Sequence, residues 1–147
     1  MKEGVIMKKI SIIYWSARGN VEVLAEHISK GVKASEAEVN IKQVHYAKPE
    51  DVLKADAVAF GSPSMDNNQI DQTEMAPFLE NFKNLNLENK PVVLFGSYGW
   101  DNGEFIEKWE TQMKEYGFNV IGKLAVQETP NEKELEEAKK LGQMLVE

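Results

Sequence analysis

Six residues that follow the first apolar run carry the clearest chemical signal in this chain of 147 residues. The run at residues 9–14 is rich in β-branched side chains and ends in a small, polar turn. The turn contains Ser16, Ala17, Arg18, Gly19, Asn20 and Val21. A helical pattern begins at once, and the first backbone N–H groups of a helix have no partners within it, while the helix dipole favours negative charge there. Because Ser16 and Asn20 can add side-chain donors, the turn predicts a phosphate site. Its spacing is neither that of a Walker loop nor that of the Gly-x-Gly-x-x-Gly turn, so an ordinary turn remains the alternative.

Two later loops, at residues 61–71 and 95–103, contain candidates for holding the rest of a ligand. The first is long for a connection between a strand and a helix, and long loops in compact domains are more often functional. It contains Ser62, Pro63, Ser64, Met65, Asp66 and Asn67. The second contains Ser97, Tyr98, Gly99 and Trp100. An exposed indole beside a binding edge can stack on a flat ring, although the side chain of Met65 or of Trp100 could instead cover the core.

The phosphate turn, Met65 and Trp100 together indicate that the ligand is a planar, phosphorylated heterocycle. FMN fits better than a dinucleotide, because there is one anion site and no acidic ribose-binding residue at the expected distance.

The elements that must position these loops alternate regularly along the chain. Apolar runs lie at residues 9–14, 38–44, 57–61, 91–96 and 120–126. Helical patterns lie at residues 20–33, from about 49, and at 73–84, 102–116 and 132–146. This alternation predicts an α/β fold, a doubly wound five-stranded parallel sheet of order 2-1-3-4-5 with helices on both faces. The loops after the first, third and fourth strands then meet at the carboxyl edge of the sheet.

Several local signals fix the expected ends and faces of the helices. We expect Asp101, with Glu104 three residues later, to cap the helix at 102–116, and Asn131 to cap the last helix. Gly117 suits the end of the fourth helix. The buried face expected for the helix at 73–84 consists of Met75, Phe78, Leu79, Phe82 and Leu85.

Composition excludes several classes of function. The chain has no cysteine, so thiolate catalysis and disulfides are excluded, and no apolar run approaches the roughly 20 residues that span a bilayer. A net charge of −7 argues against nucleic acid as a partner, and either suits docking to basic surfaces or simply keeps the protein soluble. We expect residues 1–7 to be an N-terminal extension, with Met7 a possible start, residues 8–147 to form one domain, and the protein to be cytoplasmic.

From about Lys9 onward, the chain resembles the short-chain flavodoxins. The resemblance is strongest at residues 13–16, 19–20, 77–78 and 94–100. It implies a low-potential one-electron carrier with non-covalently bound FMN and no substrate turnover. It implies that Ser16, Arg18, Gly19, Asn20 and Val21, joined by Ser62, line the phosphate. Met65 would pack on one face of the ring and Trp100 on the other, with the backbone of Asp66, Asn67 and Gly99 at the polar edge of the ring and Ser97 near it.

The resemblance also implies partners and charges around the ring. The partners would be redox enzymes, ferredoxin-type reductases and oxidoreductases, which dock on an acidic surface around the flavin edge, and we expect a monomer. Acidic residues near the ring would disfavour its anionic, fully reduced form and so lower its potential. Those expected there are Asp66, Asp71, Asp101 and Glu104.

Two positions depart from the family pattern. Arg18 and Val21 stand where the family usually has hydroxyl side chains, so the loop should bind FMN more weakly unless the guanidinium of Arg18 compensates. Asp66 stands where the family commonly has glycine, so the loop should resist rotation of the peptide that follows Met65. Asn67 tolerates the left-handed conformation.

Two alternatives from other classes remain open at this point. One is a small FMN-dependent reductase, which needs room over the ring that Trp100 would block. The other is a flavodoxin-like domain that binds FMN weakly or not at all and acts as an interaction module, an alternative that the lost hydroxyls keep open.

Overall fold

A computed structural model describes residues 7–147, and it contains one five-stranded parallel sheet. The strands are β1 (Lys9–Tyr14), β2 (Glu38–Gln43), β3 (Ala57–Gly61), β4 (Pro91–Tyr98) and β5 (Asn119–Gln127). The helices are α1 (Asn20–Ala34), α2 (Pro49–Leu53), α3 (Met75–Leu79), α4 (Phe105–Tyr116) and α5 (Glu132–Val146). Short 3₁₀ turns are η1 (Val44–Tyr46), η2 (Asp66–Asn68) and η3 (Glu80–Phe82). The strand order is β2-β1-β3-β4-β5, which confirms the prediction. The expected extension at residues 1–7 lies, apart from Met7, outside the described residues.

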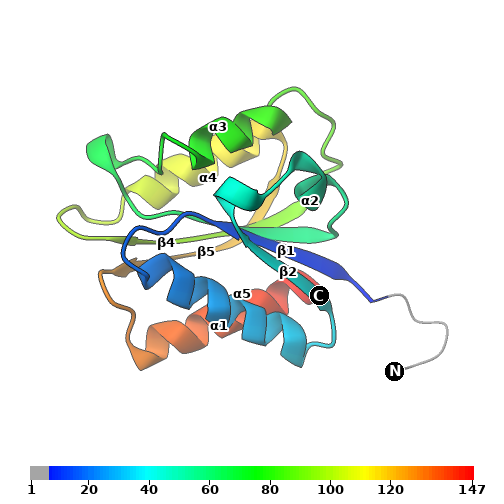
Figure 1. Ribbon diagram of the computed structural model, residues 1–147, viewed down its shortest axis with the longest axis horizontal. Helices are drawn as coiled ribbons and strands as arrows, with labels where there is room; N and C mark the ends of the chain where they lie inside the picture. The colour runs from blue at the N-terminus through cyan, green and yellow to red at the C-terminus, as the bar shows by residue number, and fades with distance from the viewer. Residues whose placement is uncertain (1–6) are drawn as a thin grey trace.

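The sheet is the middle of three layers. Helices α1 and α5 cover one face, and α2, α3 and α4 cover the other (Figure 1). Each face has its own cluster of buried apolar side chains, with Phe60 and Trp109 in one and Ile12 and Leu24 in the other. Strands β1, β3 and β4 are buried on both faces, which explains why their sequences are apolar at nearly every position.

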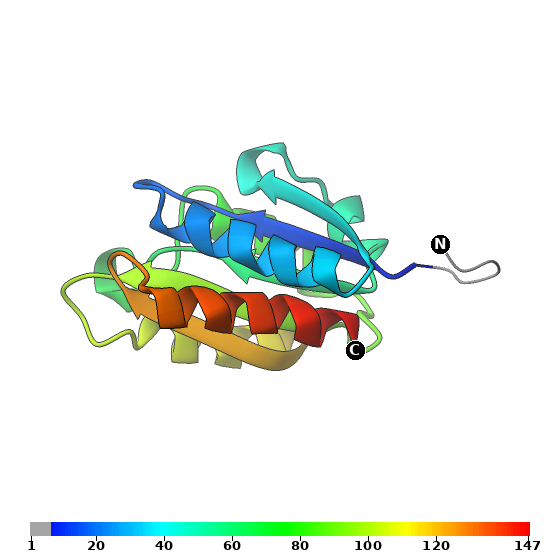
Figure 2. The ribbon, with the colours of Figure 1, turned by 90° about the horizontal axis from the view of Figure 1, so that it is seen from below.

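Helices α1 and α5 lie side by side on their face of the sheet (Figure 2) and approach closely through two glycines. A Cβ atom added to Gly142 would lie 2.1 Å from the carbonyl oxygen of Ile28, and one added to Gly31 would lie 1.9 Å from that of Lys139. Glycine is required at both positions by this close approach rather than by an unusual backbone angle. The contact fixes α1, whose first turn faces the loops described below.

The helix ends differ in part from the sequence-based expectations. Helix α4 begins at Phe105 with Glu104 as its N-cap, so the prediction that Asp101 caps it was wrong. Gly103 has φ +76°, outside the helical region, and the carboxylate of Asp101 instead accepts a hydrogen bond from the Gly103 N–H. Asn131 does cap α5 in a capping box, and α4 ends at a left-handed Gly117, both as predicted.

The segment at 73–84 also differs from its expected form. It divides into the short helix α3 and the turn η3 rather than forming one helix. Four of the side chains expected on its buried face are buried, whereas Leu85 is 45% exposed. None of the helices within residues 7–147 is both long enough and apolar enough to span a membrane.

Candidate functional site

The loops after β1, β3 and β4 enclose a cavity of about 410 Å³ at the carboxyl edge of the sheet, a size typical of small-molecule sites. It opens where the strand order reverses, as parallel α/β sheets require. Its lining consists of Ser16, Ala17, Arg18, Asn20, Val21, Pro63, Ser64, Met65, Ser97, Tyr98, Gly99, Trp100 and Glu128. The fold therefore brings together most of the residues that the sequence singled out, from three separate loops.

The end of the cavity formed by the first loop is rich in free donors. Gly19 has φ +92°, and its N–H donates to Ser16 Oγ at 3.1 Å. Among the hydrogen bonds of residues 7–147, none uses the backbone N–H of Ala17, Arg18 or Asn20. The hydroxyl of Ser16 accepts from Gly19 and can still donate its own hydrogen. These N–H groups at the start of α1, with the exposed Arg18 beside them, suit a phosphate.

The second and third loops contribute to the cavity two large apolar side chains that are in contact with water. Met65 is 39% exposed, and Trp100 is fully exposed. Leaving such surface in water forgoes the free energy of burying it, about 25 cal/mol per Å². A flat ring placed between the two side chains would cover both. The donors of the first loop and this apolar pair, which line one cavity, fit the phosphate and the ring of FMN.

Hydrogen bonds join the second and third loops across the site. Ser64 N donates to Ser97 O at 2.7 Å, and Ser64 Oγ donates to Asp101 Oδ2, also at 2.7 Å. Lys108 Nζ of α4 donates to Asn67 O at 3.3 Å. A second hollow adjoins the cavity here and shares four of its residues. It is lined by Ser64, Met65, Asp66, Asn68, Gly99, Trp100 and Asp101.

Four of the predicted site residues do not line the main cavity: Gly19, Ser62, Asp66 and Asn67. Ser62 is completely buried, its Oγ accepting from Asp71 N and donating to Pro63 O, both at 2.9 Å. Asp66 lines the adjoining hollow. Asn67 adopts the left-handed conformation, with φ +63°. Contact between these residues and a cofactor stays a prediction.

Asp71 is placed differently from the sequence-based expectation that it lies near the ring. It is 1% exposed, and its carboxylate accepts from Glu74 N, Met75 N and Thr73 Oγ1 at 2.7–2.9 Å. Burial by itself would raise the pKa of Asp71, but these hydrogen bonds outweigh it and hold the pKa below its ordinary value. The carboxylate therefore anchors the start of α3 and does not line the cavity.

Glu128 was missed by the sequence reasoning. It directly follows β5, has φ +55°, and is held at the cavity because its N–H donates to Tyr98 O at 2.7 Å. The signal was available, since the carboxyl end of every strand of a parallel sheet lies at the same edge. The prediction named only the loops after the first, third and fourth strands.

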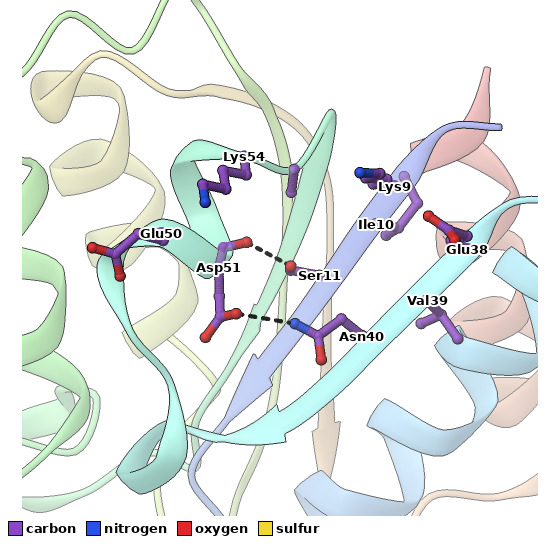
Figure 3. A pocket seen from close by; sticks show the side chains of 10 residues that line it. Lys9, Ile10, Ser11, Glu38, Val39, Asn40, Glu50, Asp51 and Lys54 are labelled. Carbon is purple, nitrogen blue, oxygen red and sulfur yellow. Dashed lines mark hydrogen bonds between the residues drawn. The ribbon is translucent and has the colours of Figure 1, made fainter. Parts of the chain in front are cut away.

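A second cavity, of about 470 Å³, lies at the opposite end of the strands, between β1, β2 and α2 (Figure 3). Its polar groups bind one another. Ser11 Oγ donates to Asp51 O at 2.6 Å, and Asn40 Nδ2 donates to Asp51 Oδ1 at 3.2 Å. Burial would raise the pKa of Asp51, but hydrogen bonds from Lys48 N and Lys42 hold it below its ordinary value. This cavity is similar in size to the one at the carboxyl edge, but its lining contains no aromatic side chain.

Comparison with known proteins gives consistent results. The chain matches the flavodoxin family over residues 12–142. It is 34% identical to a flavodoxin of Megasphaera elsdenii over 134 residues, 91% of this chain and 96% of that protein. It is 36% identical to a flavodoxin of Clostridium beijerinckii over 126 residues, 85% of this chain and 91% of that protein.

Similarity extends to solved structures and to a longer protein. The solution structure of the two-electron reduced Megasphaera elsdenii flavodoxin matches with a TM-score of 0.82, over 93% of this chain and 98% of that one. An anaerobic nitric oxide reductase flavorubredoxin of Vibrio vulnificus is 26% identical over 143 residues, but these are only 28% of that protein.

Proposed function

This chain belongs to the flavodoxin family of FMN-binding electron carriers, and from that premise we propose that it carries single electrons at low potential between redox enzymes. Bound FMN supplies the one-electron redox chemistry. The side chains and backbone of the cavity bind the cofactor, orient its ring and keep water from most of its surface.

The observation that carries the assignment of the site is the pairing of two features in one cavity. Free N–H groups at the start of α1 and the exposed side chains of Met65 and Trp100 line the same cavity. We propose that Ser16, Arg18 and Asn20, with the backbone of residues 17–21, hold the phosphate. Met65 and Trp100 then stack on opposite faces of the ring, and the backbone near Asp66, Asn67 and Gly99 binds its polar edge.

An electron carrier is favoured over a reductase by the position of Trp100. An indole over one face of the ring and Met65 over the other leave only the edge accessible, which suffices for electron transfer but not for hydride transfer from a stacked nicotinamide. NADPH oxidation by the FMN-loaded protein alone should therefore be no faster than that by free FMN. Turnover well above that level would favour the reductase.

The charges around this edge indicate the kind of partner. Asp66, Glu104 and Glu128 are exposed and Asp101 is partly exposed. Asp66 and Asp101 belong to loops of the site, Glu104 directly follows one of them, and Glu128 lines the cavity from the end of β5. Such a cluster attracts basic surfaces and speeds encounter. The proposed partners are ferredoxin-type reductases and oxidoreductases with basic docking patches, met in the cytoplasm by a monomer.

The direct test is to purify the protein, remove any bound flavin, and titrate it with FMN while following flavin fluorescence and the visible spectrum. We expect a yellow protein and stoichiometric quenching of FMN fluorescence. A preparation that stays colourless with excess FMN would leave only the interaction-module alternative.

A further inference from the structure

A hydrogen bond lies directly beside the two apolar side chains that would hold the ring. Ser64 Oγ donates to Asp101 Oδ2 at 2.7 Å. Ser64 immediately precedes Met65, and Asp101 immediately follows Trp100. We infer that this bond sets the separation between Met65 and Trp100, which makes Ser64 and Asp101 positioning residues for the ring. The inference rests on the function proposed above.

Both partners of the bond are themselves held in place. Ser64 N donates to Ser97 O of β4 at 2.7 Å, and Asp101 Oδ1 accepts from Gly103 N at 2.8 Å. The bond therefore connects the end of a buried strand to the turn that starts α4. Because both Ser64 and Asp101 are also bonded elsewhere, this bond fixes the second loop relative to the third.

The third loop has few other attachments near Trp100. Within residues 7–147, one further hydrogen bond ties residues 99–101 to another element, from Gln127 Nε2 to Gly99 O at 3.4 Å. At that length the bond is weak, whereas a bond to a carboxylate is about twice as strong as a neutral one. The Ser64–Asp101 bond is accordingly the stronger of the two restraints on residues 99–101, while the bond from Glu128 N to Tyr98 O, at 2.7 Å, holds the start of the loop. A restrained loop loses less conformational entropy when it closes on a ligand, which raises affinity.

The effect on ring binding can be separated from phosphate binding by comparing FMN with riboflavin, which lacks the phosphate. Ser64→Ala removes the bond and should lower the affinities for FMN and for riboflavin by the same factor. That factor is about ten-fold, as expected for one lost hydrogen bond to a charged group. Arg18→Ala should lower the affinity for FMN alone. Ser35→Ala, a partly buried serine at the far end of α1, is the matched control and should change neither. Unchanged affinities in Ser64→Ala, or a loss confined to FMN, would overturn the inference.

A second pair of variants separates the hydrogen bond from the charge of Asp101. Asp101→Asn keeps an acceptor for Ser64 Oγ but removes a negative charge, so riboflavin affinity should fall less than in Ser64→Ala while the midpoint potential of bound FMN rises. Asp56→Asn is its matched control, because Asp56 accepts from Lys9 N at 2.8 Å at the opposite end of the sheet.

The double variant Ser64→Ala/Asp101→Ala completes the test, because two residues that act through one bond are not additive. It should bind riboflavin no more weakly than whichever of the single variants, Ser64→Ala or Asp101→Ala, has the lower affinity. Fully additive losses would overturn the inference. Thermal unfolding of each flavin-free variant monitors folding. Wild-type protein that binds neither flavin would instead refute the proposed function.

Discussion

The guanidinium of Arg18 is exposed at the start of α1, in a turn where backbone N–H groups have no partner within the described chain. We propose that its charge replaces the hydrogen bond of the hydroxyl side chain that the resemblance leads us to expect at this position. We predict that Arg18→Ala weakens FMN binding at least several-fold at low salt, with a smaller effect at high salt because screening already reduces the attraction. Fluorescence titration at two ionic strengths measures both. Lys30→Ala, an exposed cation on the same helix, is the control, and equal Kd values for Arg18→Ala and wild type would remove Arg18 from the site.

Asp71 governs a different property, the response of stability to acid. Its pKa is held below the ordinary value of 3.8 by hydrogen bonds from Met75, Thr73 and Glu74. A carboxyl group whose pKa is lower in the folded state stabilises the protein above its unfolded pKa, and that stabilisation is lost as pH falls through the folded pKa. We predict that Asp71→Asn lowers the free energy of unfolding by about 1–2 kcal/mol at pH 7. The difference from wild type should shrink as pH falls below about 4.

Urea denaturation at a series of pH values measures this difference. Asp56→Asn, which changes the same charge at an exposed position, is the control. A destabilisation of Asp71→Asn that is as large at pH 3 as at pH 7 would contradict the assignment, since it would not depend on the charge.

At the scale of elements, the site depends on how closely α1 and α5 pack. The first turn of α1 contains the proposed phosphate donors, and its place against the sheet is fixed by the contacts of Gly31 and Gly142 with the opposite helix. A methyl group on Gly142 would overlap the carbonyl of Ile28, whereas glycine to alanine in an unhindered helix would be favourable by about 1 kcal/mol.

We predict that Gly142→Ala destabilises the protein by about 2–3 kcal/mol, because overpacking of a close contact outweighs the gain in helix propensity. For a domain of this size the melting temperature should fall by roughly 5–12 °C. Gln143→Ala, at the exposed neighbouring position, is the control and should leave it nearly unchanged. A melting temperature equal to or above that of wild type would show that the two helices separate at little cost.

At the scale of the whole molecule, we expect the net charge of −7 to affect docking only where it is concentrated. Glu104 directly follows the third loop of the site, whereas Glu136 lies exposed on α5, on the other side of the sheet. We predict that Glu104→Lys slows reduction of the FMN-loaded protein by a ferredoxin-type reductase several-fold at low salt, and that the difference vanishes at high salt. Glu136→Lys changes the net charge equally and should have little effect. Stopped-flow reduction at several salt concentrations distinguishes a local docking surface from a general effect of charge, which would slow both variants alike.

The sequence by itself determined the architecture, the strand order and the identity of the three loops that form the cavity. Buried strands need continuous apolar runs, helices need apolar residues at every third or fourth position, and parallel strands of a doubly wound sheet place their carboxyl ends at one edge. Each of these signals is local or periodic, so it can be found in a single chain. The capping of α5 by Asn131 and the end of α4 at Gly117 were predictable for the same reason.

Only the tertiary structure decided which side chains of those loops face the cavity. Ser62 and Ser64 are separated by one residue, yet Ser62 is buried against Asp71 while Ser64 lines the cavity and bonds Asp101. Glu128 joins the site from the end of β5, and Asp101 binds the second loop instead of capping α4. These outcomes depend on contacts between residues that are 9 to 37 positions apart in sequence. No local pattern encodes the burial of Ser62 or the partner of Asp101, because the direction of a loop side chain is set by the groups that the fold brings opposite it.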